Sequence, residues 1–183
     1  MSDYHFFLLA AAITALVAAG IDLRTGHIPN RLTLGALAVA PIAHGAATAL
    51  RTHSASAALV SLGASLLGAT LCAFLPLMMY RSLGLGGGDV KLFAAIGALV
   101  KAGVGLRAET YAFVFGMVWA LLVVARSGRL ASTFGNVATL VTGPLRRGAD
   151  RRQVHREQMT SLPFGPAILA GTVFAAAMCW RVR

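Results

Sequence analysis

The stretch YHFFLLAAAITALVAAGID, residues 4–22, has no Asp, Glu, Lys or Arg before its last residue, Asp22. An apolar helix of about 20 residues is long enough to cross the ~30 Å hydrocarbon core of a bilayer. The stretch therefore predicts a membrane-spanning helix that ends at an aspartate. No Lys or Arg precedes it, whereas a cleaved signal peptide begins with a positively charged segment. We expect the stretch to be retained as the first span.

The rest of the chain repeats this pattern, with five further apolar segments at 32–50, 55–80, 90–100, 109–125 and 162–180. The third segment is long enough to tilt or to be broken near Pro76. The fourth is short, and is either a half-span or a span extended through Lys101 toward Leu106. The composition is 57% hydrophobic and 12% charged, against about 25% charged residues in soluble domains. We expect an all-α polytopic membrane protein with about six transmembrane helices, forming a single domain over residues 1–183.

The charge balance is strongly basic, with 16 Lys and Arg against 6 Asp and Glu. In a soluble protein this balance would suggest nucleic acid as a partner. Here no soluble module is left to bind it, so basic loops at an anionic cytoplasmic leaflet are the better interpretation. We expect membrane lipids, and no nucleic acid, among the partners.

The basic residues are distributed unequally between alternate loops. Eleven follow the first, third and fifth segments: Arg24, Arg31, Arg81, Lys91, Arg126, Arg129, Arg146, Arg147, Arg151, Arg152 and Arg156. The opposite side carries five: Arg51, Lys101, Arg107, Arg181 and Arg183. The positive-inside rule then makes the first set cytoplasmic and both termini periplasmic. Residues 126–161 form a basic cytoplasmic loop, which either lies along the membrane surface or docks a substrate or partner.

Two of the six acidic residues differ from the others in their surroundings. Asp22 and Asp89 each lie at the boundary of an apolar segment, on the side expected to be cytoplasmic. A carboxylate at membrane depth is costly and is by default a functional hypothesis. The remaining acidic residues fall in expected loops or near the termini, where a solvated charge needs no explanation: Asp3, Glu109, Asp150 and Glu157.

Asp22 opens the stretch Asp-Leu-Arg-Thr-Gly-His-Ile-Pro-Asn, which ends at Asn30. Pro29 fixes its own φ and favours an extended Ile28, and we expect Asn30 to cap the next helix. The plain alternative for Asp22 is an ion pair with Arg24 or the cap of a turn.

Asp89 closes the stretch Gly-Leu-Gly-Gly-Gly-Asp, which begins at Gly84. The glycines allow close approach of the backbone or unusual φ angles. A phosphate-binding loop is a poorer interpretation, because no Gly-Lys-Ser/Thr ending follows and no strand is expected before it. The plain alternative for Asp89 is the N-cap of a helix that starts at Val90.

Two carboxyl groups that share one site cannot both ionise easily, so they hold a proton between them. The ionised member can take a proton from water while the protonated member donates to a scissile carbonyl. This chemistry hydrolyses peptides without a metal or a nucleophilic side chain. We expect no metal and no cofactor, since Cys72, Cys179 and the five histidines show no metal-ligand spacing.

Three stretches resemble the type IV prepilin peptidase family. Asp22-x-Arg24-x-x-x-Ile28-Pro29-Asn30 is similar to the first motif of the family. Gly86-x-Gly88-Asp89-x-Lys91-Leu92 is similar to the second, the Gly-x-Gly-Asp motif shared with other intramembrane aspartic proteases. Leu-Pro-Phe-Gly-Pro at residues 162–166, followed by Gly171, is similar to the pattern of its last helix.

The resemblance implies a leader peptidase of the bacterial inner membrane, which cleaves the basic leader of prepilins and pseudopilins at the cytoplasmic face. It places the catalytic roles on Asp22 and Asp89. It implies supporting or substrate-binding roles for the other motif residues: Arg24, Pro29, Asn30, Gly86, Gly88, Lys91, Pro163 and Pro166.

Bifunctional members of the family carry a loop with two Cys pairs and also N-methylate the new N-terminus. This chain has only two cysteines, neither in such a loop, and resembles the short, peptidase-only form of tight-adherence (Flp) pilus systems. We therefore expect no methyltransferase activity and no S-adenosylmethionine binding.

Several side chains keep two interpretations. His27 is either a solvated loop residue or a modulator of the two aspartates, and His44 lies in a helix kinked by Pro41 or in a proton relay. Lys91 either extends toward the interface or biases the charge of the aspartates. Two other classes of protein also remain open. They are a small transporter that binds a cation or proton at Asp22 and Asp89, and a structural subunit of a secretion machine.

Overall fold

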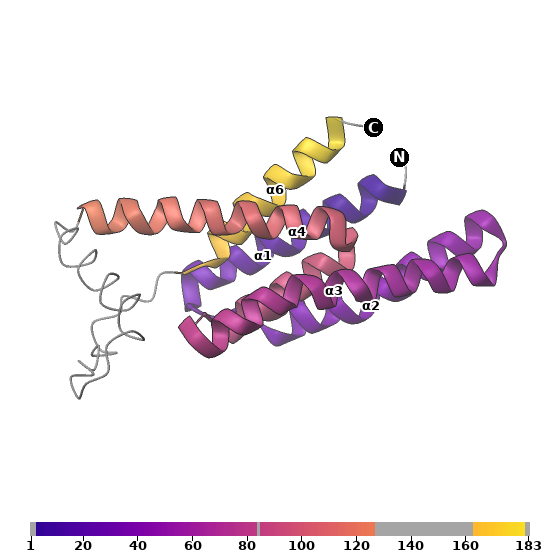
Figure 1. The fold of residues 1–183 in the computed structure, drawn as a ribbon, viewed down its shortest axis with the longest axis horizontal. Helices are drawn as coiled ribbons and strands as arrows, with labels where there is room; N and C mark the ends of the chain where they lie inside the picture. Colours follow the sequence, from indigo (N-terminus) through magenta and orange to yellow (C-terminus); the bar gives the residue numbers. More distant parts are fainter. Residues whose placement is uncertain (1–2, 84, 127–162, 182–183) are drawn as a thin grey trace, which may run out of the picture. The chain divides into compact units, whose positions relative to one another are not determined.

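The computed structural model describes residues 3–83, 85–126 and 163–181, which are helical apart from short connections. The helices are α1 (Asp3–Thr25), α2 (Asn30–Thr52), α3 (Ala55–Leu83), α4 (Gly87–Arg126) and α6 (Gly165–Arg181) (Figure 1). The chain divides into two compact units, one of Met1–Gly116 with Pro163–Arg183 and the other of Met117–Leu162. The expected basic loop at 126–161 lies outside the described residues, except for Arg126 at the end of α4.

Four of these helices, α1 to α4, are long and apolar enough to cross a membrane, and Gly165–Trp180 is a shorter apolar helix. Large apolar side chains also cover their outer surfaces, as at Leu50 (79% exposed) and Val60 (73% exposed). A helix that is apolar all round belongs in a membrane or a large core. The all-helical, membrane-spanning class expected from composition is therefore confirmed. Pro76 lies inside α3, which runs unbroken from Ala55 to Leu83, so the alternative of a break there is wrong.

Helix α4 is divided into two segments at Lys101, whose backbone is non-helical at φ 61° and ψ 174°. The rings of Phe93 and Phe113 have centroids 5.6 Å apart, although 20 residues of straight helix would separate them by about 30 Å. A Cβ on Gly105 would lie 3.1 Å from the Cα of Gly97. The chain therefore turns back at Lys101, and the two segments on either side of it, residues 87–100 and 102–116, form a helical hairpin.

This turn settles two expectations about the sequence around it. The fourth apolar segment does not extend through Lys101 as one span, because the chain reverses there. Glu109 is not a solvated loop residue: it lies two helical turns beyond the reversal and is 3% exposed. Neither of its carboxylate oxygens has a hydrogen-bond partner among the described residues.

The first segment of α4 forms the core of its unit, with every residue from Leu92 to Val100 buried. Its contact with α3 is close, because the backbones of Gly68 and Gly97 touch and a Cβ on either would clash with the carbonyl of the other. Packing of this kind between small residues is typical of helices in lipid.

The reversal at Lys101 leaves carbonyl groups at the end of the first segment without intrahelical partners. Two buried side chains satisfy them. Ser65 Oγ donates to the carbonyl of Ala98 at 2.7 Å, and His44 Nε2 lies 2.8 Å from the carbonyl oxygen of Leu99. The His44 ring also stacks on Phe7 with centroids 3.6 Å apart. His44 thus joins α1, α2 and the end of a core helix, which favours a structural role over a proton relay.

Helix α1 lies antiparallel to α6. His5 near its start contacts the ring of Trp180 with centroids 4.1 Å apart, and Asp22 near its end contacts Gly165 at the start of α6. This pairing determines the surroundings of the first aspartate.

Candidate active site

Asp22 lies one turn before the end of α1 and is 7% exposed. Its Oδ2 accepts a hydrogen bond from the backbone N–H of Gly165 at 2.9 Å. The alternative pairing with Arg24 is not formed. Arg24 is exposed, and within the described ranges the single ion pair joins Arg51 and Asp3. Asp22 is therefore a buried carboxylate bound to the beginning of a distant helix.

The contact with Asp22 requires a glycine at position 165. A Cβ there would lie 2.8 Å from Asp22 Oδ2, 3.0 Å from Asp22 Cβ and 3.2 Å from the Cα of Ala19. Gly165 is also the first residue of α6, and a helix N-terminus carries partial positive charge on its free N–H groups. The same geometry supplies a donor and a favourable electrostatic field to the Asp22 carboxylate.

Asp89 lies in the first turn of α4 and is 8% exposed. The N–H groups of Asp89 and Val90 donate to the carbonyl of Gly86 at 3.0 and 3.3 Å. A Cβ on Gly86 would lie 2.8 Å from Asp89 Oδ2, so the glycine leaves room for the carboxylate beside the turn. The helix begins at Gly87, two residues before Asp89, so Asp89 is not the N-cap of a helix starting at Val90.

The segments next to the two aspartates are in contact with each other. A Cβ on Gly88 would lie 3.0 Å from the Cβ of Ile28, and Lys91 Nζ donates to Asn30 Oδ1 at 2.8 Å. These contacts join the α1–α2 connection to the start of α4. They bring Asp22 and Asp89 within electrostatic range of one another.

The remaining motif residues of the α1–α2 connection have simpler surroundings. Arg24 and His27 are exposed. Pro29 precedes α2 in an extended conformation, with φ −66° and ψ 129°. The expectation that Asn30 caps α2 is wrong, because Asn30 is already the first helical residue and its side-chain oxygen accepts the Lys91 proton instead. Lys91 thus contacts the first motif.

Of the two prolines in the third motif, Pro163 precedes α6 and is half-buried. Pro166 lines an apolar groove between α1 and α6, together with Leu9 and Ile13, and so faces away from the aspartates. The residue of this motif that contacts Asp22 is Gly165, which has no side chain to mark it as a candidate in the sequence. Within the described ranges, no group of three His, Cys, Asp or Glu side chains could hold a metal ion.

The helices carry apolar side chains on all sides, and two buried carboxyl groups interact near the same end of them. These features define a multi-pass membrane protein with a carboxylate site. The sequence profile of the type IV leader peptidase family matches residues 9–123, which is more than half of the chain. The chain belongs to this family of peptidases, and the match includes Asp22 and Asp89. It ends before α6, so the Gly165 contact is a structural observation alone. No curated protein and no solved structure matches the chain.

Proposed function

We propose that this protein is an aspartic endopeptidase that removes the basic leader of prepilins or pseudopilins at the cytoplasmic face of the bacterial inner membrane. The observation that carries the proposal is the convergence of Asp22 and Asp89. Both are buried, they interact electrostatically, and direct contacts join the two loops around them. Membership of a leader peptidase family supports the reaction class.

The surroundings of the two carboxyl groups suggest which one acts as the general base and which one as the general acid. Asp22 receives an N–H hydrogen bond and faces the N-terminus of α6, both of which favour a negative charge on its carboxylate. Asp22 is then the general base that takes a proton from the attacking water. Asp89 retains the shared proton and donates it to the oxygen of the scissile carbonyl.

The fold supports the proposed topology of about six spans with both termini periplasmic. The reversal at Lys101 converts α4 into two antiparallel segments, which with α1, α2, α3 and α6 makes six helical segments among the described residues. The α1–α2 connection and the start of α4, which contact each other, then lie on one face of the membrane with both aspartates. The excess of basic residues on this side assigns it to the cytoplasm.

We further propose cleavage without N-methylation, as in the short form that serves Flp pili, with no S-adenosylmethionine. Mass spectrometry of the mature pilin would then show an unmodified N-terminal amine.

The test is replacement of each aspartate by asparagine in cells that also express a prepilin. Asp22→Asn and Asp89→Asn keep the side-chain size but remove a group that can exchange the proton. We expect processing to fall by about 10²-fold or more, with wild-type amounts of protein in the membrane. The readout is the ratio of precursor to mature pilin on an immunoblot.

Asp3→Asn is the matched control, because Asp3 is a carboxylate near the opposite end of α1. It should leave processing unchanged. Normal processing by a well-inserted Asp89→Asn variant would refute the two-aspartate mechanism.

A further inference from the structure

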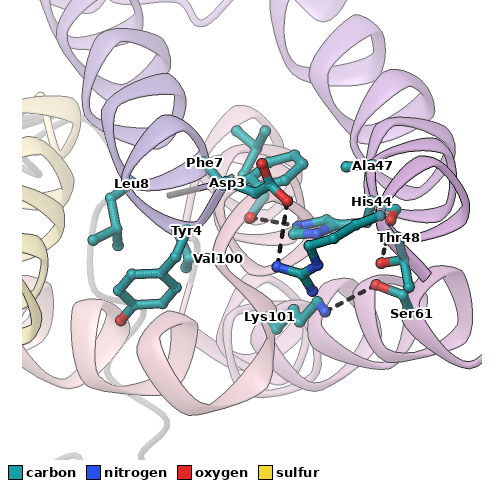
Figure 2. A pocket seen from close by; sticks show the side chains of 12 residues that line it. Asp3, Tyr4, Phe7, Leu8, His44, Ala47, Thr48, Ser61, Val100 and Lys101 are labelled. Carbon is teal, nitrogen blue, oxygen red and sulfur yellow. Dashed lines mark hydrogen bonds and ion pairs between the residues drawn. The ribbon is translucent and has the colours of Figure 1, made fainter. Parts of the chain in front are cut away.

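A second polar site lies far from the aspartates, at the end of the helices where the chain reverses at Lys101. It is a cavity of about 190 Å³, with room for several water molecules. Figure 2 shows His44, Lys101 and Asp3 pointing toward the same space. The polar and charged side chains that line it come from four helices and include Asp3, Tyr4, His44, Thr48, Arg51, Ser61 and Lys101.

Basic groups of like charge meet at this cavity. The two basic groups are Lys101 and Arg51, which lie within electrostatic range of one another. The nearest carboxylate, Asp3, pairs with Arg51 at 3.5 Å, while the Lys101 ammonium donates to the neutral hydroxyl of Ser61 at 3.1 Å. In the described part of the chain, Lys101 has no carboxylate partner. Mutual repulsion of cations around a cavity disfavours a metal ion and favours an anion.

The backbone at Lys101 gives independent evidence that its side chain is required. At φ 61° and ψ 174° it adopts a conformation that is essentially restricted to glycine. Glycine would make the reversal without strain, and a glycine follows nearby at 103. A lysine at the strained position is explained if its ammonium group serves the cavity.

The cavity matches the polar headgroup of a lipid, and the apolar residues beside it match the acyl chains. Leu50 and Val60, each next in sequence to a cavity residue, are 79% and 73% exposed. Arg51 lies in the last turn of α2, where a membrane span reaches the interface. A lipid whose phosphate group occupies the cavity would therefore have its acyl chains against the outer face of α2 and α3.

From these observations we propose that the cavity binds the phosphodiester headgroup of an anionic phospholipid, with Lys101 as its principal contact. The lipid belongs to the leaflet opposite the aspartates. An anionic headgroup is preferred over a zwitterionic one, because a quaternary ammonium would meet Lys101 and Arg51. The bound lipid fastens the hairpin turn of α4 to the ends of α1, α2 and α3.

The test is thermal unfolding of the purified full chain in detergent, with phosphatidylglycerol, phosphatidylcholine or inorganic phosphate added. We expect phosphatidylglycerol to raise the Tm of the wild type by several degrees, and phosphatidylcholine and inorganic phosphate to have much smaller effects. Lys101→Gly should weaken the apparent affinity for phosphatidylglycerol about tenfold or more, since a charged hydrogen bond is lost. Without lipid, its Tm should not fall, because glycine relieves the strained backbone.

Lys101→Gln is the second variant, which keeps a hydrogen-bond donor for Ser61 but removes the charge. Arg107→Gln is the matched control, because Arg107 is an exposed cation in the same helix that does not line the cavity. Equal stabilisation by phosphatidylglycerol and phosphatidylcholine, or an equal loss in Arg107→Gln, would overturn the proposal. Protection by inorganic phosphate alone would assign the cavity to a free anion and also overturn the lipid assignment.

Discussion

The hydrogen bond from Gly165 to Asp22 makes a backbone N–H part of the proposed active site, and its geometry depends on the missing side chain. The Cβ of an alanine at this position would lie 2.8 Å from Asp22 Oδ2 and 3.2 Å from the Cα of Ala19. The second of these atoms belongs to the α1 backbone, so rotation of a side chain cannot relieve the clash. The start of α6 would have to move away from α1.

We predict that Gly165→Ala lowers prepilin processing by about tenfold or more, since the displaced start of α6 weakens a hydrogen bond to a charged carboxylate, which is worth about 1.5–3 kcal/mol. The measurement is the processing rate in membranes, alongside the amount of inserted protein. Gly20→Ala is the control, because Gly20 lies two residues before Asp22 in α1 and a Cβ there meets nothing within 4 Å. Equal activity of the two variants would show that the Gly165 contact is dispensable.

At this scale, the sequence predicted the residues that stand out by charge and missed those that act through the backbone. Asp22 and Asp89 could be singled out because a carboxylate at the end of an apolar segment is unusual. Gly165 could not, since a glycine gives no sign of which partner its N–H finds. Glu109 was misplaced because its burial depends on which residue the chain reverses at, and the sequence did not single out Lys101 as that residue.

The hairpin within α4 creates a problem at the level of the element, because a helix that ends inside a bundle has unpaired carbonyls. Ser65, fully buried on α3, donates to the carbonyl of Ala98, and His44 on α2 lies within hydrogen-bond distance of the carbonyl of Leu99. Two neighbouring helices thus replace the hydrogen bonds that the helix itself would have made.

We expect Ser65→Ala to lower the free energy of unfolding by about 1–2 kcal/mol, since it leaves a buried carbonyl unpaired. Thermal unfolding in detergent measures the effect. Thr70→Ala in the same helix is the comparison, because the Thr70 hydroxyl is exposed and bonds within its own helix. A Tm equal to that of the wild type for Ser65→Ala would mean that the Ala98 carbonyl finds another partner.

The position of the reversal was only partly predictable. The apolar segments 90–100 and 109–125 correctly separated two segments of α4, and the interval between them suggested a loop. The actual turn is confined to Lys101, a residue type that does not normally adopt φ 61°. Local propensity therefore argued against a sharp turn there, and tertiary contacts at Gly68 and Gly97 override it.

For the whole molecule, the reversal determines how many times the chain crosses the membrane. With the reversal, Gly103 lies beside the end that carries Lys101 and Ser61, whereas in a continuous α4 it would lie inside the bilayer. In the orientation that we propose from the charge distribution, that end faces the periplasm. The number of spans and the orientation can thus be tested together by labelling introduced cysteines.

We predict that a membrane-impermeant maleimide added to intact cells labels Thr52→Cys and Gly103→Cys, and labels His27→Cys only after the cells are permeabilised. All three positions are exposed. A Cβ at Gly103 meets nothing within 4 Å, so this change should not disturb the turn. The native Cys72 and Cys179 are 1% and 7% exposed and provide an unlabelled background.

Labelling of Thr52→Cys but not Gly103→Cys would indicate that α4 crosses without reversing. Labelling of His27→Cys in intact cells would place the aspartates on the periplasmic face. Either result would contradict cytoplasmic cleavage by a six-span protein.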